Sequence, residues 1–230
     1  MRLDRFIESQ LAYSARTVRH LFAERKILLN GSAVGNGRQH ISEFCRVEAE
    51  GKVLQAREAV YLMLHKPRGC VSATTDPKNT TVLDLIDLPC KQQLHLAGRL
   101  DFNTTGLLLL TNDGNWSRRL TLPHRKIPKT YRVQTSDEIT AEYVQKFSEG
   151  IYFRFENLTT RPAQLKILAP HCAEITIHEG RYHQIKRMFG FFQNEVIDLH
   201  RVSISSIVLD DKLAAGEFRP LTPAEIASLD

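Results

Sequence analysis

The chain has 230 residues, of which 42% are hydrophobic and 25% are charged, and its formal net charge is +5. The hydrophobic share is ordinary for a folded protein and excludes wholesale disorder. A moderate positive charge suits a protein that meets a polyanion, because clustered Lys and Arg side chains neutralise phosphates.

The chain shows no pattern of export, membrane insertion or metal binding. No long apolar run follows the N-terminal residues, and no segment approaches the ~20 apolar residues of a membrane span. The histidines lack a tight ligand spacing, and no two cysteines form a C-x-x-C pair. The cysteines are Cys45, Cys70, Cys90 and Cys172. We therefore expect a cytoplasmic protein with reduced thiols, no membrane contact, no metal and no cofactor.

Residues 1–58 are predicted to form a small module of their own. Apolar residues at helical spacing from Leu3 to Leu11 predict a first helix, and Ser14 suits the N-cap of a second. A strand is expected at residues 27–29, followed by an Asn-Gly turn. The polar stretch of residues 51–59 is interpreted as a linker.

Basic residues gather on or beside the two predicted helices of this module. They include Arg2, Arg5, Arg16 and Arg19. They could form a solvated helical face, or a surface that grips RNA phosphates.

Residues 59–230 are predicted to form an α+β domain with a mixed, mainly antiparallel sheet, because short apolar runs alternate with turns. Strands are expected at residues 61–64, 106–110, 131–133, 174–177 and 204–209. Helices are expected near residues 136–149, 182–192 and 223–229.

The segment G-R-L-D-F-N-T-T-G-L-L-L-L-T-N-D-G, residues 98–114, combines a polar loop, a buried strand and an Asn-Asp-Gly turn. Asp101 lies in the loop, where a carboxylate can serve as nucleophile or general base. Spacing alone favours a turn-capping aspartate at this position, a role that Asp113 suits more clearly.

Two resemblances bear on these alternatives. The segments R-L-D-R-F-I, S-A-R-T-V-R-H-L and K-I-L-L-N-G-S-A-V resemble the small RNA-binding domain found in ribosomal protein S-four. The motif G-R-L-D-x-x-T-x-G-L-L-L-L-T-N-D-G resembles the catalytic motif of pseudouridine synthases, in the RsuA family that modifies ribosomal RNA. The segments H-K-P-R-G, K-T-Y, E-G-R-Y-H-Q-I-K-R-M-F and L-H-R, at residues 65, 129, 179 and 199, follow in the family's order.

The resemblance implies a function and a set of site residues. It implies isomerisation of uridine to pseudouridine in small-subunit (16S) ribosomal RNA, a reaction that needs no cofactor or metal. We expect the substrate RNA to lie within an assembling subunit, and we expect a monomer because no stripe of residues suited to a dimer interface is seen. Asp101 would be the catalytic carboxylate, Tyr131 would stack on the uracil, and Lys186 would pair with Asp101. Arg99 would occupy the space left by the flipped base, and Leu199 would pack beneath the pocket. His183 and Gln184 would touch RNA or stabilise their turn.

Two other functional classes remain open at this point. The first is a non-catalytic RNA-binding or ribosome-assembly factor, against which the presence of Asp101, Tyr131 and Lys186 argues. The second is a carboxylate-dependent RNA hydrolase, which would need clustered acids to hold divalent metal. The motifs here are basic, which disfavours the hydrolase.

Overall fold

The computed structural model describes residues 1–229 and divides into two compact units, Met1–Ala59 and Val60–Asp230. The first unit packs two helices against a small antiparallel sheet of strand order β2-β1-β3-β4. Its elements are α1 (Leu3–Leu11), α2 (Ala15–Ala23), β1 (Ile27–Leu29), β2 (Ser32–Ala33), β3 (Val47–Ala49) and β4 (Lys52–Gln55).

The core of the first unit follows from its helical spacing. The buried face of α1 consists of Leu3, Phe6 and Ile7. At the start of α2, the Ser14 hydroxyl accepts a hydrogen bond from the Thr17 amide. Because the N-terminal amides of a helix lack internal partners, such a cap stabilises the helix by about 1 kcal/mol. Asn30 and Gly31 both adopt positive φ, as the predicted turn requires.

The prediction of a linker over residues 51–59 was wrong in its first half. Glu50 and Gly51 both have positive φ, so the chain reverses there and β4 pairs with β3 through Ala49 and Lys52. The strand was missed because it lies at the sheet edge and carries exposed side chains, which leaves no apolar pattern. Within the predicted linker, only residues 56–59 have no assigned strand or turn.

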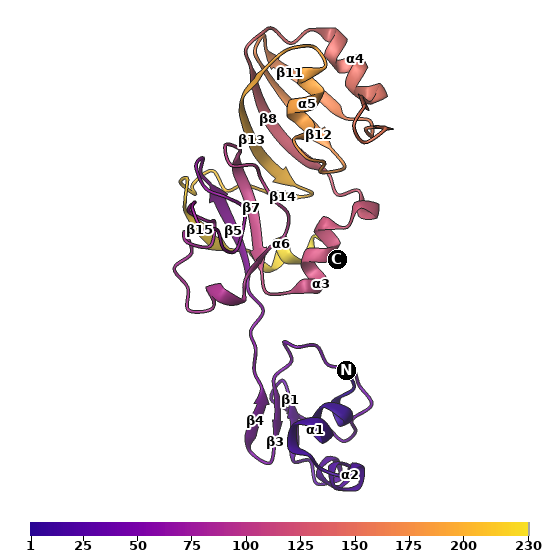
Figure 1. The fold of residues 1–230 in the computed structure, drawn as a ribbon. Coiled ribbons are helices and arrows are strands. Elements are labelled where there is room, and N and C mark those ends of the chain that lie inside the picture. The colour runs from indigo at the N-terminus through magenta and orange to yellow at the C-terminus, as the bar shows by residue number, and fades with distance from the viewer. Residues whose placement is uncertain (230) are drawn as a thin grey trace. The chain divides into compact units, whose positions relative to one another are not determined.

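The second unit is built on a mixed sheet of order β11-β12-β8-β13-β7-β5-β15 (Figure 1). Neighbouring strands are antiparallel apart from the parallel pair β13 and β7, which confirms the predicted mainly antiparallel sheet. The strands of this path are β5 (Tyr61–Lys66), β7 (Thr105–Thr111), β8 (Lys129–Thr135), β11 (Gln164–Ala169), β12 (Cys172–Ile177), β13 (Val196–Ile204) and β15 (Phe218–Pro220). Shorter elements are β6 (His95–Leu96), β9 (Tyr152–Phe153), β10 (Leu158–Thr159), β14 (Ile207–Val208), and the 3-10 turns Lys91–Gln93 and Pro123–Arg125.

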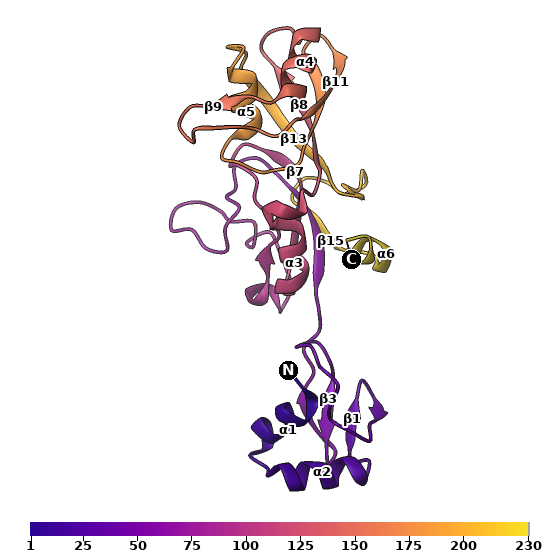
Figure 2. The ribbon, with the colours of Figure 1, turned by 90° about the vertical axis from the view of Figure 1, so that its right-hand side faces the viewer.

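Helices cover the two halves of this sheet separately. α4 (Ala141–Glu149) and α5 (Gln184–Gly190) pack on the half formed by β11, β12, β8 and β13 (Figures 1 and 2). α3 (Gly114–Thr121) and α6 (Pro223–Ala227) pack near β7, where Trp116 is fully buried and donates to the Ile226 carbonyl. The predicted Asn-Asp-Gly turn is therefore the start of a helix, because the Asp113 carboxylate caps α3 through the amides of Asn115 and Trp116.

Strand β7 is buried on both of its faces. Leu107 and Leu109 pack with α3, whereas Leu108 and Leu110 pack against the long loop that follows β5. Since side chains alternate across a strand, an uninterrupted run of leucines is what a strand covered on both sides requires. Asp101 precedes this strand, so a rigid element sets the position of its loop.

The expected strand over residues 204–209 is instead a hairpin. β13 ends at Ile204, Ser205 has a φ of +53°, and Ile207 pairs back with Ile204. Within residues 1–229, no helix is long and apolar enough to cross a membrane.

Candidate active site

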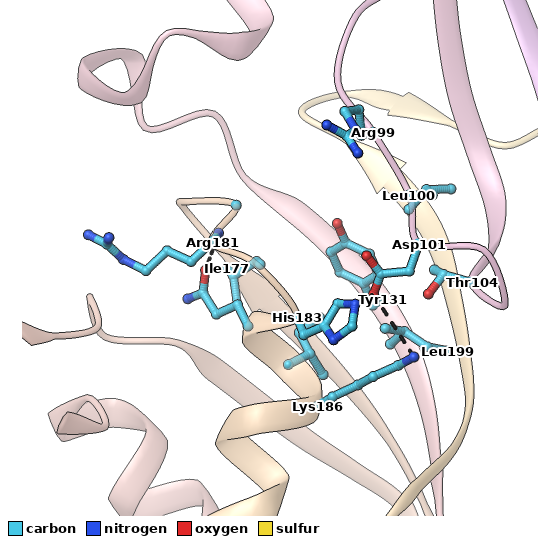
Figure 3. A pocket seen from close by; sticks show the side chains of 13 residues that line it. Arg99, Leu100, Asp101, Thr104, Tyr131, Ile177, Arg181, His183, Lys186 and Leu199 are labelled. Atoms are coloured by element: carbon cyan, nitrogen blue, oxygen red, sulfur yellow. Dashed lines mark hydrogen bonds and ion pairs between the residues drawn. The ribbon is translucent and has the colours of Figure 1, made fainter. Parts of the chain in front are cut away.

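A small cavity of about 80 Å³ brings together the site residues predicted in the second unit. Asp101 comes from the loop before β7, Tyr131 from β8 and Lys186 from α5. Arg99, His183, Gln184 and Leu199 also line the cavity. Figure 3 shows Asp101, Tyr131, His183 and Lys186 converging, whereas the Arg181 side chain extends away from the carboxylate.

The Asp101 carboxylate has two cationic or potentially cationic neighbours, both at long range. His183 Nε2 lies 3.6 Å from Asp101 Oδ2, and Lys186 Nζ lies 4.0 Å from the same oxygen. The Asp101 side chain is 33% exposed to solvent. Its carboxylate is therefore attracted to positive charge but is not locked into a tight ion pair, and it faces a space that a substrate can enter.

Lys186 and Arg187, which follow one another in the sequence, lie on different sides of α5. Arg187 makes a two-pronged ion pair with Glu156, at 2.7 and 2.5 Å, and lies over the Phe153 ring. This pair holds the pKa of the Glu156 carboxyl below its ordinary value. Neighbouring residues on a helix point about 100° apart, so only Lys186 faces Asp101.

The backbone around Asp101 is held by three side chains from other segments. Arg201 donates to the Arg99 carbonyl at 3.3 Å, and the Ser72 hydroxyl bonds both the amide and the carbonyl of Leu100 at 3.0 and 2.7 Å. Lys66 donates to the carbonyls of Phe102 and Thr104 at 3.2 and 2.9 Å. The loop from residue 99 to residue 104 is thus fixed on both sides of Asp101.

Lys66 and Arg201 were not singled out from the sequence, although both lie in the segments that carry the resemblance. They are 0% and 1% exposed, and burial lowers the pKa of the Lys66 ammonium. A cation that is buried normally needs hydrogen-bond partners. The sequence signals for these supporting roles were therefore the position of Lys66 at the end of an apolar strand and that of Arg201 within a strand.

Tyr131 forms part of the wall of the cavity and is also a core residue. It is 7% exposed, and its hydroxyl accepts a hydrogen bond from Arg201 Nη1 at 3.3 Å. Arg201 lies directly opposite Tyr131 in the pairing of β13 with β8. Leu199, two residues earlier on β13, lines the same cavity.

Gln184 is engaged inside its own turn. Its amide oxygen accepts from the Arg181 backbone, and its amide nitrogen donates to Glu179 at 2.8 Å. His183 precedes α5 with a φ of +48°. Of the two roles predicted for this pair, the geometry suits turn stabilisation for Gln184, while the His183 ring faces Asp101.

The basic residues of the first unit differ in their partners. Arg2 pairs with Asp4 and Arg5 pairs with Glu8. Arg19 donates to the Ala15 carbonyl within α2, and Arg16 is exposed. Of the predicted phosphate-binding residues, Arg16 and Arg19 are thus those whose charge is not already paired with a carboxylate in the described chain.

Among residues 1–229, no three His, Cys, Asp or Glu side chains gather closely enough to hold a metal ion. The chemistry that the cavity itself offers comes from one partly exposed carboxylate, a neighbouring imidazole and ammonium, and an aromatic wall.

Comparisons with known proteins give a consistent result. The family model described as RNA pseudouridylate synthase matches residues 60–190. The chain is 51% identical to ribosomal small subunit pseudouridine synthase A of Pseudomonas aeruginosa and 42% identical to that of Escherichia coli, with each alignment covering 100% of both proteins. A crystal structure of a pseudouridylate synthase matches with a TM-score of 0.73 and 41% identity, and it also covers 100% of both chains.

Proposed function

Because the chain belongs to the RNA pseudouridylate synthase family, we propose that it converts a uridine of small-subunit (16S) ribosomal RNA to pseudouridine, with Asp101 as the catalytic carboxylate. The observation that carries this proposal is the partly exposed Asp101 carboxylate, set beside Tyr131 in a cavity and flanked by Lys186. The names of the relatives at 42% and 51% identity support the small-subunit target.

Asp101 supplies the charge that this reaction needs. The bond between the uracil nitrogen and the ribose breaks, the base rotates, and the base rejoins through carbon. A carboxylate can act as a nucleophile, or it can stabilise positive charge on the sugar. The reaction transfers no electrons and no group to another molecule, so the proposal requires neither cofactor nor metal.

The walls of the cavity would receive a base that has left its stack. Base flipping costs a few kcal/mol, and contacts with the flipped base offset this cost. The Tyr131 ring offers a flat apolar face, and Leu199 lines the same space. Arg99 lies two residues before Asp101 and would occupy the space that the base leaves in the RNA.

Lys186 and His183 would orient the carboxylate through their charge. The Lys186 ammonium lies 4.0 Å from Asp101 Oδ2, and this long-range contact leaves the carboxylate oxygens available to the ribose. We assign catalysis to residues 59–230 and additional RNA binding to residues 1–58, including Arg2, Arg5, Arg16 and Arg19. The substrate would be RNA in an assembling small subunit, bound by a monomer.

The test uses small-subunit ribosomal RNA tritiated at carbon five of uracil, incubated with the protein and a metal chelator. The wild-type protein is expected to release tritium and leave the strand uncut. Asp101→Asn keeps the size of the side chain but removes its charge, so the rate should fall by at least about 10³-fold while RNA affinity persists.

Asp211→Asn is the matched control, because Asp211 is exposed in a turn outside the cavity. It should release tritium at the wild-type rate. Full activity of Asp101→Asn would contradict the assignment of the carboxylate. Strand cleavage by the wild-type protein would instead indicate a hydrolase, and RNA binding without tritium release would indicate a non-catalytic factor.

A further inference from the structure

A second cavity, of about 610 Å³, lies next to the first and shares Tyr131 and Arg99 with it. Its volume falls within the usual range for ligand sites, about 300–1,000 Å³. Lys129, Arg161 and Arg201 also line it. Lys129 is two residues before Tyr131 on β8, so both side chains lie on the same face of that strand.

These three cations have no carboxylate partner among the described residues. Lys129 Nζ donates to the Ile127 carbonyl at 3.1 Å, and Arg201 donates to carbonyls and to the Tyr131 hydroxyl. One terminal nitrogen of Arg161 and one of Arg201 are buried without a hydrogen-bond partner.

The two acidic residues that line this cavity already have other partners, and Glu179 also accepts a hydrogen bond from the Arg161 backbone amide at 3.0 Å. Glu179 forms an ion pair with Arg181, and Glu156 forms one with Arg187. Neither carboxylate is within ion-pair distance of Lys129, Arg161 or Arg201 in the described chain. The charges of Lys129, Arg161 and Arg201 are therefore not paired with a carboxylate in the described chain.

Holding cations in this way costs free energy, because charges removed from water need compensation. Burial, together with the nearby Arg201 charge, lowers the pKa of Lys129 to about 8. An anion that entered the cavity would offset this cost and complete the missing hydrogen bonds.

We propose that this cavity binds a phosphodiester of the RNA strand adjacent to the target uridine, with Lys129 contacting the phosphate directly. The inference rests on the proposed function. Each nucleotide has a backbone phosphate on either side of its sugar. A strand whose base enters the Asp101 cavity must therefore place a phosphate close by, and Tyr131 borders both spaces. Arg161 and Arg201 contribute charge and the unfilled hydrogen-bonding positions.

The experiment measures the affinity of a short small-subunit ribosomal RNA fragment that the wild-type enzyme modifies. In separate fragments, the phosphate on one side of the target uridine is replaced by an uncharged methylphosphonate. For the all-phosphate RNA, Lys129→Met should weaken binding about tenfold, because a charge-assisted hydrogen bond is removed. Lys129→Arg, which keeps the charge, should restore most of the affinity.

One of the two neutral linkages should weaken RNA binding by the wild-type protein to a similar extent. The same linkage should not weaken RNA binding by Lys129→Met any further. Such non-additivity is the sign of a direct contact. Lys166→Met is the control for general charge, since Lys166 is exposed on β11 and lines neither cavity; it should keep wild-type sensitivity to the neutral linkage.

Two outcomes would overturn the inference. In the first, neither neutral linkage weakens RNA binding by the wild-type protein, or the loss of affinity caused by a neutral linkage adds fully to the loss caused by Lys129→Met. In the second, inorganic phosphate binds to the wild-type protein but not to Lys129→Met while both neutral linkages have no effect, which would assign the cavity to a free anion. Failure of the proposed function is distinct, because the wild-type enzyme would then form no pseudouridine in any fragment.

Discussion

At the scale of single residues, Lys129 illustrates a conflict between a binding role and stability. Its ammonium is partly buried beside another cation, and its pKa falls from an ordinary value of 10.5 to about 8. Below pH 8 the group is protonated in both the folded and the unfolded chain, and the full desolvation cost is present. Between about pH 8 and 10.5 the folded chain loses the proton first, so the cost declines as pH rises.

Lys129→Met should therefore raise the free energy of unfolding of the second unit near neutral pH. We expect a gain on the order of 1 kcal/mol, less than the pKa change alone implies, because solvent screens a partly exposed group. The gain should shrink by about pH 10. Urea unfolding followed through the fluorescence of Trp116, the single tryptophan, reports on this unit. A gain that is constant across this pH range would exclude desolvation of Lys129 as its cause.

The sequence indicated the residues that line the site better than those that support it. Asp101, Tyr131 and Lys186 stand in motifs, and motif order placed them in one site. Lys66, Ser72 and Arg201 act through backbone carbonyls or amides of residues 28 to 102 positions away. A lysine or arginine in an apolar strand signals that a buried cation needs partners, but it does not identify them, because any residue can supply a backbone oxygen. The positions of these three side chains therefore required the structure.

At the scale of elements, the contact between β7 and β13 determines where Asp101 lies relative to Tyr131. Gly106 has a φ of +104°, and a Cβ placed there would lie 2.3 Å from the Arg201 carbonyl oxygen. Gly106 and Arg201 are also paired in the parallel register of the two strands. Only a residue without a side chain allows this approach.

Gly106→Ala should lower the stability of the second unit by about 2–4 kcal/mol, because it combines a strained backbone with a steric clash. Tritium release should fall as well, since the Asp101 loop would shift with β7. Gly114→Ala is the control, because nothing lies within 4 Å of a Cβ at Gly114, and it should change stability by less than about 1 kcal/mol. Equal stability of the two variants would show that the strands can separate without cost.

Elements with strong apolar patterns were predictable, and those with mixed patterns were not. β5 and β7 were expected because their residues are apolar in succession. β13 was missed, because the buried Arg201 and the partly buried His200 interrupt its apolar positions. β11 was missed because most of its side chains are exposed. The first unit was easier, since its capping serine and Asn-Gly turn are local signals.

At the scale of the whole molecule, RNA binding by the first unit should appear as salt dependence. Residues 1–59 contain 10 Lys and Arg against 7 Asp and Glu, and several of these basic residues are internally paired. Charges paired with a carboxylate release fewer counterions on binding RNA than free ones do. Phosphate binding by this unit should therefore depend mainly on arginines such as Arg16 and Arg19.

In the full-length chain, replacing both Arg16 and Arg19 with Gln should weaken binding to small-subunit ribosomal RNA. The slope of log affinity against log salt should become shallower by about 0.7–0.9 for each RNA phosphate that the variant no longer neutralises. Arg5→Gln is the matched control, because Arg5 is already paired with Glu8 at 2.9 Å, and its slope should change less. Tritium release at saturating RNA should remain at the wild-type rate, since the Asp101 cavity is untouched. If the double variant kept the wild-type slope, the basic side of these helices would be a solvated surface, and the RNA affinity of the chain would arise from the second unit alone.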